Sequence, residues 1–215
     1  MGKPVREITN RGTSKNTGYF TSSHSGLVKF ESHLERDAMF ILESDKRIKK
    51  FKSQPMKVHY TLDNKKRQYT PDIEVHFKNK KKKSLILEVK IHEKLQENRL
   101  KFRAIKNRLN KWGYDYSVIT EKFIQQQPRL DNIKLLHRYS EIKVSKKTYE
   151  KIEQSFSGKK YFILGHLKEE LINKGILVNE FYAAIYRKIL IVNIDQKIDF
   201  EANIFFNPKG GITSC

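Results

Sequence analysis

The sequence has few of the residues that mark secreted or membrane-embedded proteins. Its 215 residues include one cysteine, Cys215, which excludes a disulfide scaffold and a zinc site built on cysteines. No apolar run approaches the ~18 residues that a membrane-spanning helix needs. Residues 1–10 are polar and charged and lack the apolar core of a secretory signal. We therefore expect a cytoplasmic protein.

Acidic residues are also scarce beside basic ones. Lys and Arg total 44 and Asp and Glu total 24, which leaves a formal net charge of +20 at pH 7. Such a charge favours nucleic acid as a partner, because cations that neutralise phosphates release counterions and give sequence-independent affinity. The plainer interpretation is a protein from a lysine-rich proteome. The 13 Phe and 10 Tyr residues, with many Ile and Leu, are enough to form a folded core.

Composition and periodicity divide the chain into three parts. Residues 1–25 form a basic arm, residues 26–140 mix helices and strands in an α/β domain, and residues 141–215 have the helix, helix, helix, hairpin order of a winged helix. The first two parts are expected to contain a hairpin at 19–30, helices at 32–46, 95–112 and 129–139, and strands at 56–62, 67–77, 84–91 and 116–120. The third part is expected to contain helices at 146–155, 161–174 and 179–187 and strands at 188–194 and 203–206.

The segment 67–91 carries the most informative pattern, because apolar residues alternate there with acids. If its turn centres on residue 80, Asp72 faces Glu88 on one side of the hairpin, with Cβ atoms ~5 Å apart. Two carboxylates this close repel by about 1 kcal/mol in water and by more in a less polar cleft. Either one acid binds a proton, or a divalent cation such as Mg²⁺ lies between them. Lys90 points to the same side, where it suits orienting a water molecule or stabilising charge on a phosphate.

A third acid, Glu35, falls on the apolar arc of the helix at 32–46. An unpaired acid is costly there, so Glu35 either shares a metal with Asp72 and Glu88 or serves only the capping box that begins at Ser32. An acid followed two residues later by lysine is common in this chain. Only the triplet 88–90 lies in an apolar strand with an acid opposite. The alternative is an ordinary charged sheet face.

Pro71-Asp72 followed by Glu88-Val89-Lys90 resembles the PD-(D/E)xK signature of restriction-endonuclease-like nucleases. With the surrounding segments 31–37, 54–55 and 69–72, the sequence is similar to the TnsA family, the endonuclease subunits of heteromeric Tn7-like transposases. The resemblance implies an α/β fold: a restriction-endonuclease-like mixed sheet flanked by helices, followed by a small winged-helix-like domain. It implies Mg²⁺, with Mn²⁺ as a substitute, held by Asp72, Glu88 and Glu35. It also implies the catalytic residues, which are Glu35, Asp72, Glu88 and Lys90.

The resemblance further implies a bacterial DNA endonuclease that nicks the 5′ ends of a transposable element during cut-and-paste transposition. The implied partners are double-stranded DNA at the transposon ends, a TnsB-like DDE transposase, and a TnsC-like AAA+ ATPase that we expect to bind the C-terminal domain. Two alternatives remain. A restriction or repair nuclease of the same fold would cleave without partners, and a non-catalytic basic module would bind DNA without regard to Mg²⁺.

Overall fold

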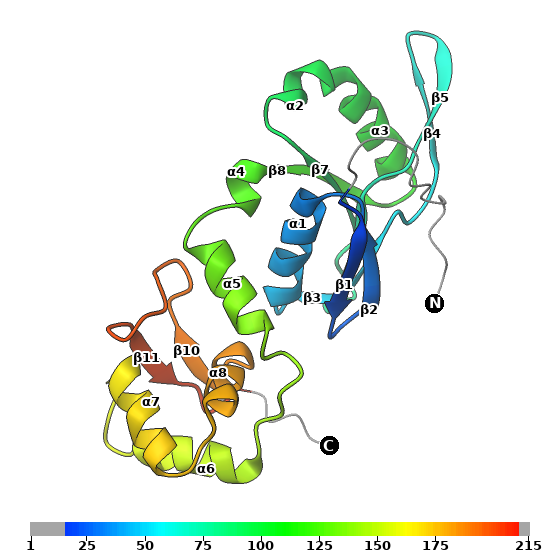
Figure 1. Cartoon of the computed structure of the whole chain (residues 1–215). Coiled ribbons are helices and arrows are strands. Elements are labelled where there is room, and N and C mark those ends of the chain that lie inside the picture. The colour runs from blue at the N-terminus through cyan, green and yellow to red at the C-terminus, as the bar shows by residue number, and fades with distance from the viewer. Residues whose placement is uncertain (1–15, 211–215) are drawn as a thin grey trace. The chain divides into compact units, whose positions relative to one another are not determined.

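The computed structural model describes residues 16–210, so the basic arm expected at 1–25 lies mostly outside the described residues. The chain forms two compact units. Unit 1 ends at Gln126 and unit 2 begins at Gln127, and each is described by itself (Figure 1). Within residues 16–210, no helix is both long and apolar enough to cross a membrane.

Unit 1 is built from a mixed four-stranded sheet, two hairpins and four helices. Its strands are β1 (Gly18–Ser22), β2 (Gly26–Phe30), β3 (Ile48–Ser53), β4 (Val58–Leu62), β5 (Lys65–Tyr69), β6 (Ile73–Phe77), β7 (Leu85–Lys90) and β8 (Asp115–Thr120). Its helices are α1 (His33–Ser44), α2 (Lys94–Glu97), α3 (Arg99–Lys111) and α4 (Glu121–Ile124). The sheet has the order β3-β6-β7-β8, while β1–β2 and β4–β5 pair only with each other. Only β7 and β8 run parallel, and α2 and α3 connect them.

Helices cover both faces of the central strands. On one face, Ala38 of α1 packs in a core cluster with Val75 and Val89. On the other face, Ile105 of α3 packs in a second cluster with Ile86, and both side chains are completely buried. Because successive residues of a strand point to opposite faces, this two-sided cover also buries the polar residues that alternate with the apolar ones.

The predicted α/β class with a mixed sheet is confirmed. The short helix α4 was not expected, and three further elements differ from expectation. The strand expected at 67–77 is two strands, because the chain leaves the β4–β5 pair and enters the main sheet at residues 70–72, where Pro71 has no N–H to donate. The helix expected at 95–112 is divided at Asn98. Strand β3 was not expected.

Unit 2 combines four helices with a small antiparallel sheet. Its elements are α5 (Arg129–His137), α6 (Lys146–Ser155), β9 (Phe162–Ile163), α7 (Leu164–Asn173), α8 (Val178–Tyr186), β10 (Leu190–Val192) and β11 (Asn203–Phe206). The strand order is β10-β11-β9. The fully buried Ile152, Leu167 and Phe181 bring α6, α7 and α8 into one core. Three helices followed by a hairpin is the expected order, and β9 is an addition to it.

The division between the units lies before the boundary expected at 140–141. Helix α5 falls in unit 2, because Leu136 packs in the same core cluster as the other helices of that unit. The side-chain amide of Asn132 donates to the carbonyls of Ile194 at 2.9 Å and Gln196 at 2.6 Å. These contacts tie the helix expected at 129–139 to the C-terminal part of the chain.

Candidate active site

The candidate site begins where the pairing of β6 and β7 ends. Ile73 faces Leu87, which is the register expected for a turn centred on residue 80. Asp72 lies just before β6, and its Oδ2 accepts a 2.8 Å hydrogen bond from the backbone N–H of Val89. The backbone pairing with β7 ends at Ile73, and the Asp72 carboxylate contacts β7 in its place. This hydrogen bond holds the carboxylate beside the neighbouring residues of that strand.

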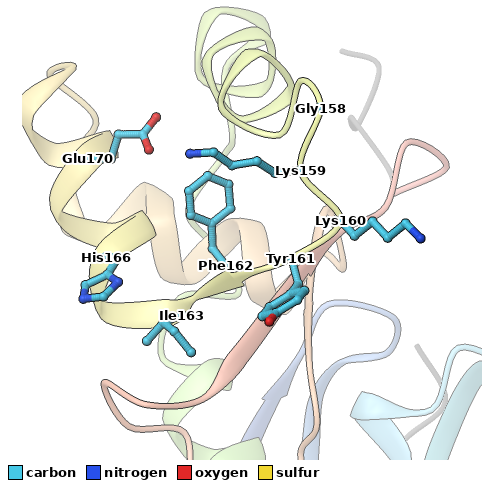
Figure 2. A pocket seen from close by; sticks show the side chains of 8 residues that line it. All are labelled: Gly158, Lys159, Lys160, Tyr161, Phe162, Ile163, His166 and Glu170. Carbon is cyan, nitrogen blue, oxygen red and sulfur yellow. The ribbon is translucent and has the colours of Figure 1, made fainter.

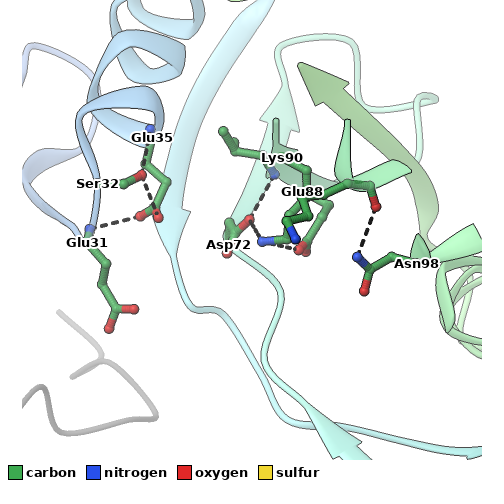
Figure 3. Close-up of polar contacts among 9 residues, drawn as sticks. Glu31, Ser32, Glu35, Asp72, Glu88, Lys90 and Asn98 are labelled. Carbon is green, nitrogen blue, oxygen red and sulfur yellow. Dashed lines mark hydrogen bonds and ion pairs between the residues drawn. The ribbon is translucent and has the colours of Figure 1, made fainter. Parts of the chain in front are cut away.

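The ammonium of Lys90 pairs with Asp72 and Glu88, two of the three acids of the expected site. Its Nζ lies 2.8 Å from Oε1 of Glu88 and 3.7 Å from Oδ2 of Asp72. Figure 3 shows the three side chains converging from the two strands. The structure therefore brings together the acids and the lysine that the alternation of the two strands had placed on one face.

Asp72, Glu88 and Lys90 lie close together in a largely buried site, so the charge of each one shifts the pKa of the others. Burial, followed by the negative charge of Asp72, raises the pKa of Glu88 to about 7. Burial also raises the pKa of Asp72, against the opposing effect of Lys90. Burial disfavours the charged form of Lys90, but Asp72 and Glu88 outweigh it, so the pKa of Lys90 is raised and the ammonium is retained.

Two tyrosines lie within electrostatic reach of Glu88. Burial, followed by the charges of Asp72 and Glu88, raises the pKa of Tyr69, and burial followed by Glu88 raises the pKa of Tyr116. Both phenols therefore stay neutral. Neither hydroxyl makes a well-aligned hydrogen bond to a described residue.

The carboxylates have the chemistry of a divalent-cation site. Both oxygens of Glu88 are buried, and Oε1 lies 2.8 Å from Nζ of Lys90, the ammonium that Glu88 shares with Asp72. Two acids that share one ammonium in a largely buried site leave negative charge that a further cation would offset, and hard cations such as Mg²⁺ prefer carboxylate oxygens. Asp72 and Glu88 therefore fit such a cation. Within residues 16–210, no three or more His, Cys, Asp or Glu side chains are grouped to hold a metal.

Glu35 lies apart from this group, at the start of α1. Its carboxylate accepts hydrogen bonds from the backbone N–H of Glu31 at 2.9 Å and from Oγ of Ser32 at 3.0 Å. The backbone N–H of Glu35 donates in turn to Oγ of Ser32 at 3.1 Å. Burial, followed by the charge of Asp72, raises the pKa of Glu35. The side chain thus has the capping role considered for it and also lies within electrostatic reach of Asp72.

Gln54, from the segment 54–55 that carries part of the resemblance, contributes through contacts that the sequence did not reveal. Its backbone N–H donates to the carbonyl of Asp72 at 2.9 Å, so it fixes the acid from the β3 side. Its φ of 46° lies in the left-handed region, which is uncommon for a residue with a side chain. The side chain is buried, and its Oε1 has no hydrogen-bond partner among the described residues. No periodicity or propensity indicates this conformation.

Lys101 of α3 is a second such contributor. Its Nζ lies 4.1 Å from the ring centroid of Tyr69. Burial lowers its pKa, with Glu88 opposing and Lys90 adding to this effect. The sequence placed Lys101 among the many bases of this helix. Lys101 lies four residues before the buried Ile105, and this spacing is what could have distinguished it in the sequence from the other bases of the helix.

A separate pocket of about 800 Å³ lies in unit 2. Residues 158–163 line it together with His166 and Glu170 (Figure 2). Within it, Nζ of Lys159 lies 4.4 Å from the ring centroid of Phe162, and Glu170 pairs with Lys174 at 2.6 Å. None of the expected site residues belongs to this pocket.

Comparison with known families identifies part of unit 1. Residues 45–121, about a third of the chain, match the family model described as TnsA-like endonuclease N terminal. The match includes Asp72, Glu88 and Lys90, whereas Glu35 lies before it. Among curated proteins, none matches this chain. The matched segment is similar to the N-terminal domain of TnsA-like endonucleases, and this similarity implies a nuclease with DNA as its substrate.

Proposed function

We propose that this chain is the metal-dependent endonuclease subunit of a heteromeric transposase and that it nicks DNA at the 5′ ends of a transposable element. The observation that carries the proposal is the Lys90 ammonium paired with the buried Glu88 and the partly buried Asp72, inside the TnsA-like segment. The net charge of +20 adds support for DNA as the substrate.

Asp72 and Glu88 would hold the divalent cation, and Glu35 would supply a further negative charge from α1. Bound Mg²⁺, or Mn²⁺ in its place, supplies Lewis acidity toward the scissile phosphate and lowers the pKa of a nearby water molecule. Two carboxylates share the Lys90 ammonium, and the pKa of Glu88 is raised; both observations support this role, because a cation would favour the ionised form of Glu88.

Lys90 acts next to the reacting phosphate. Its ammonium stays charged beside Asp72 and Glu88, so it can donate to the attacking water and to phosphate oxygens as their negative charge grows. Tyr69 and Tyr116 lie within electrostatic reach of Glu88, whose side chain is completely buried, and electrostatic interactions are stronger in such a buried site. In-line attack by water would leave a 5′-phosphate and a 3′-hydroxyl.

Unit 2 is proposed as a winged-helix-like module that binds the AAA+ ATPase, and the DDE transposase is proposed as a further partner of the chain. In a winged helix, α8 would be the recognition helix. Arg187, which directly follows α8, donates to the carbonyls of Ile142 at 3.0 Å and Ser140 at 3.1 Å. That cation is therefore engaged within unit 2, and α8 is better suited to a protein contact than to a DNA groove.

The test is cleavage of plasmid DNA that carries the element ends, in Mg²⁺, with and without the partner transposase. Asp72→Ala and Lys90→Ala should each abolish nicking while the protein remains folded. A matched control is the double variant Glu141→Ala/Lys143→Ala, because it removes an acid and a lysine at the same spacing from an exposed segment.

Nicking that survives in the Asp72→Ala or Lys90→Ala variant would contradict the proposed site. Efficient specific cleavage by the purified chain alone would instead support the stand-alone nuclease. Loss of nicking in the control as well would indicate an indirect effect of the substitutions.

A further inference from the structure

The β4–β5 hairpin presents one packed face and one open face. Val58 and Tyr60 are buried in the core cluster that α3 shares. On the opposite face, His59 pairs with Gln68 and Thr61 pairs with Lys66, and all four side chains are exposed. We call the surface formed by these four residues the outer face.

The outer face and the hairpin tip are basic and rich in hydrogen-bond donors. Four cations lie between residues 57 and 69, and all are exposed: Lys57, Lys65, Lys66 and Arg67. The one acid in this stretch, Asp63, lies 3.6 Å from Arg67 in an ion pair. No carboxylate lies on the outer face, whose residues are all described. By the register, Lys66 lies on the outer face, whereas Lys65 and Arg67 lie on the other face beside the tip, so the positive charge that complements a polyanion gathers at the tip.

The hairpin is firmly connected to the candidate active site. Its last residue, Tyr69, lies three positions before Asp72, so the two are at most about 10 Å apart along the chain. Lys101 of α3 lies over the ring of Tyr69 and fixes the base of the hairpin. Figure 1 shows the hairpin running past α3 to its own tip.

We propose that the outer face and tip of the β4–β5 hairpin form the docking surface for double-stranded DNA next to the cleaved phosphate, an inference that rests on the proposed nuclease function. A two-stranded ribbon fits the width of the major groove. The tip at Lys65 lies seven residues before Asp72, a reach of at most about 24 Å. The hairpin therefore contacts DNA within roughly seven base pairs of the cut, at about 3.4 Å per pair.

The chain offers a matched control in the turn between β6 and β7. Lys80–Lys83 lie there, exposed, at the end of these strands opposite to Asp72 and Lys90. Lys82 lies 4.4 Å from the ring centroid of Phe77 and is left unchanged. The test pair is Lys65→Ala/Lys66→Ala against Lys81→Ala/Lys83→Ala, which remove equal charge from two exposed turns.

The measurement is the affinity of the full chain for a fluorescent duplex in EDTA, over a series of salt concentrations. The Lys65→Ala/Lys66→Ala variant should bind roughly ten-fold more weakly, and its log affinity against log salt should flatten by about two, close to one per lost phosphate contact. The control variant should keep the affinity and the slope of the unchanged protein.

A second measurement does not depend on affinity. In a Cys215→Ser background, a photo-crosslinker on Gln68→Cys should attach to duplex DNA, whereas the same group on Lys80→Cys should not. Equal crosslinking at both positions would overturn the docking surface. So would equal losses of binding in the two lysine variants, or no loss in either.

The outcomes separate this inference from the proposed function. If the unchanged chain never nicks DNA but the Lys65→Ala/Lys66→Ala variant alone loses binding, the docking surface stands and the nuclease assignment fails. If that variant binds DNA normally but no longer binds the partner transposase, the hairpin is a protein contact and the docking surface is overturned.

Discussion

Replacing Glu88 with glutamine should stabilise the metal-free protein, even though it removes a proposed metal ligand. The Glu88 side chain is 0% exposed. Burial, followed by the charge of Asp72, raises its pKa from 4.5 to about 7. Between these values the folded protein binds more protons than the unfolded chain. The stability that depends on this group is therefore fully present below about pH 4.5 and is lost as the pH rises through about 7.

The size of the effect follows from the two pKa values. At about 1.4 kcal/mol for each pH unit between them, ionising Glu88 lowers the free energy of unfolding by about 3 kcal/mol. Glutamine has nearly the same shape and no charge. We expect the Glu88→Gln variant to match the unchanged protein near about pH 5 and to exceed it by about 3 kcal/mol near about pH 8.

Urea unfolding in EDTA measures this difference, followed by the fluorescence of Trp112. Trp112 is the only tryptophan in the chain, and it follows α3 in unit 1. With roughly 1–3 kcal/mol per molar urea, the midpoint should rise by about 1–3 M at the higher pH. Adding Mg²⁺ should narrow the gap, because it favours the ionised carboxylate of the unchanged protein.

Glu74 provides the control, because it is also buried but pairs with two basic side chains, whereas Glu88 shares Lys90 with Asp72. It pairs with Lys52 at 3.0 Å and with His76 at 3.2 Å. The Glu74→Gln variant breaks these pairs and should lower stability near about pH 8. The reasoning about Glu88 would be refuted if Glu88→Gln were less stable than the unchanged protein near about pH 8, or if the difference between them did not change with pH.

Three further predictions follow from Glu88, from the cap of α1 and from the contacts of Asn132 in unit 2. At limiting Mg²⁺, nicking should rise as the pH passes about 7, because Glu88 must lose its proton to bind the cation, and more Mg²⁺ should move the midpoint to lower pH. Rate profiles at two Mg²⁺ concentrations check this, and coincident profiles would contradict it. Ser32→Ala removes the acceptor for the N–H of Glu35 and should cost about 1 kcal/mol in urea unfolding. Asn132→Ala deprives the carbonyls of Ile194 and Gln196 of their donor and should cost about 1–3 kcal/mol, seen by calorimetry as a lower melting temperature.

The register of β6 and β7 could be predicted because two local features of the sequence agree. The strands alternate between apolar and polar residues, and the lysine-rich turn fixes the centre of the hairpin near residue 80. Ile73 faces Leu87 as expected. The meeting of Asp72, Glu88 and Lys90 follows from that register, since these residues are close along a folded hairpin.

Contacts that depend on distant elements could not be predicted. Strand β3 was missed because a register shift between Ile48 and Lys50 breaks its alternation, so its buried residues Ile48 and Phe51 are three positions apart. Glu88 is buried because α3 covers its face of the sheet. The alternation of the strand predicts only that this face carries polar residues. The approach of Lys101 depends on the same packing.

The turn at residues 78–84 has a practical consequence. It lies at the far end of β6 and β7 from the acids, and most of its residues are exposed. A longer turn leaves β6 and β7 unchanged, so the distances between Asp72, Glu88 and Lys90 at the opposite end are preserved. A fluorescent protein or an affinity tag inserted between Lys80 and Lys81 should therefore fold with the chain and give an internally labelled enzyme for single-molecule work.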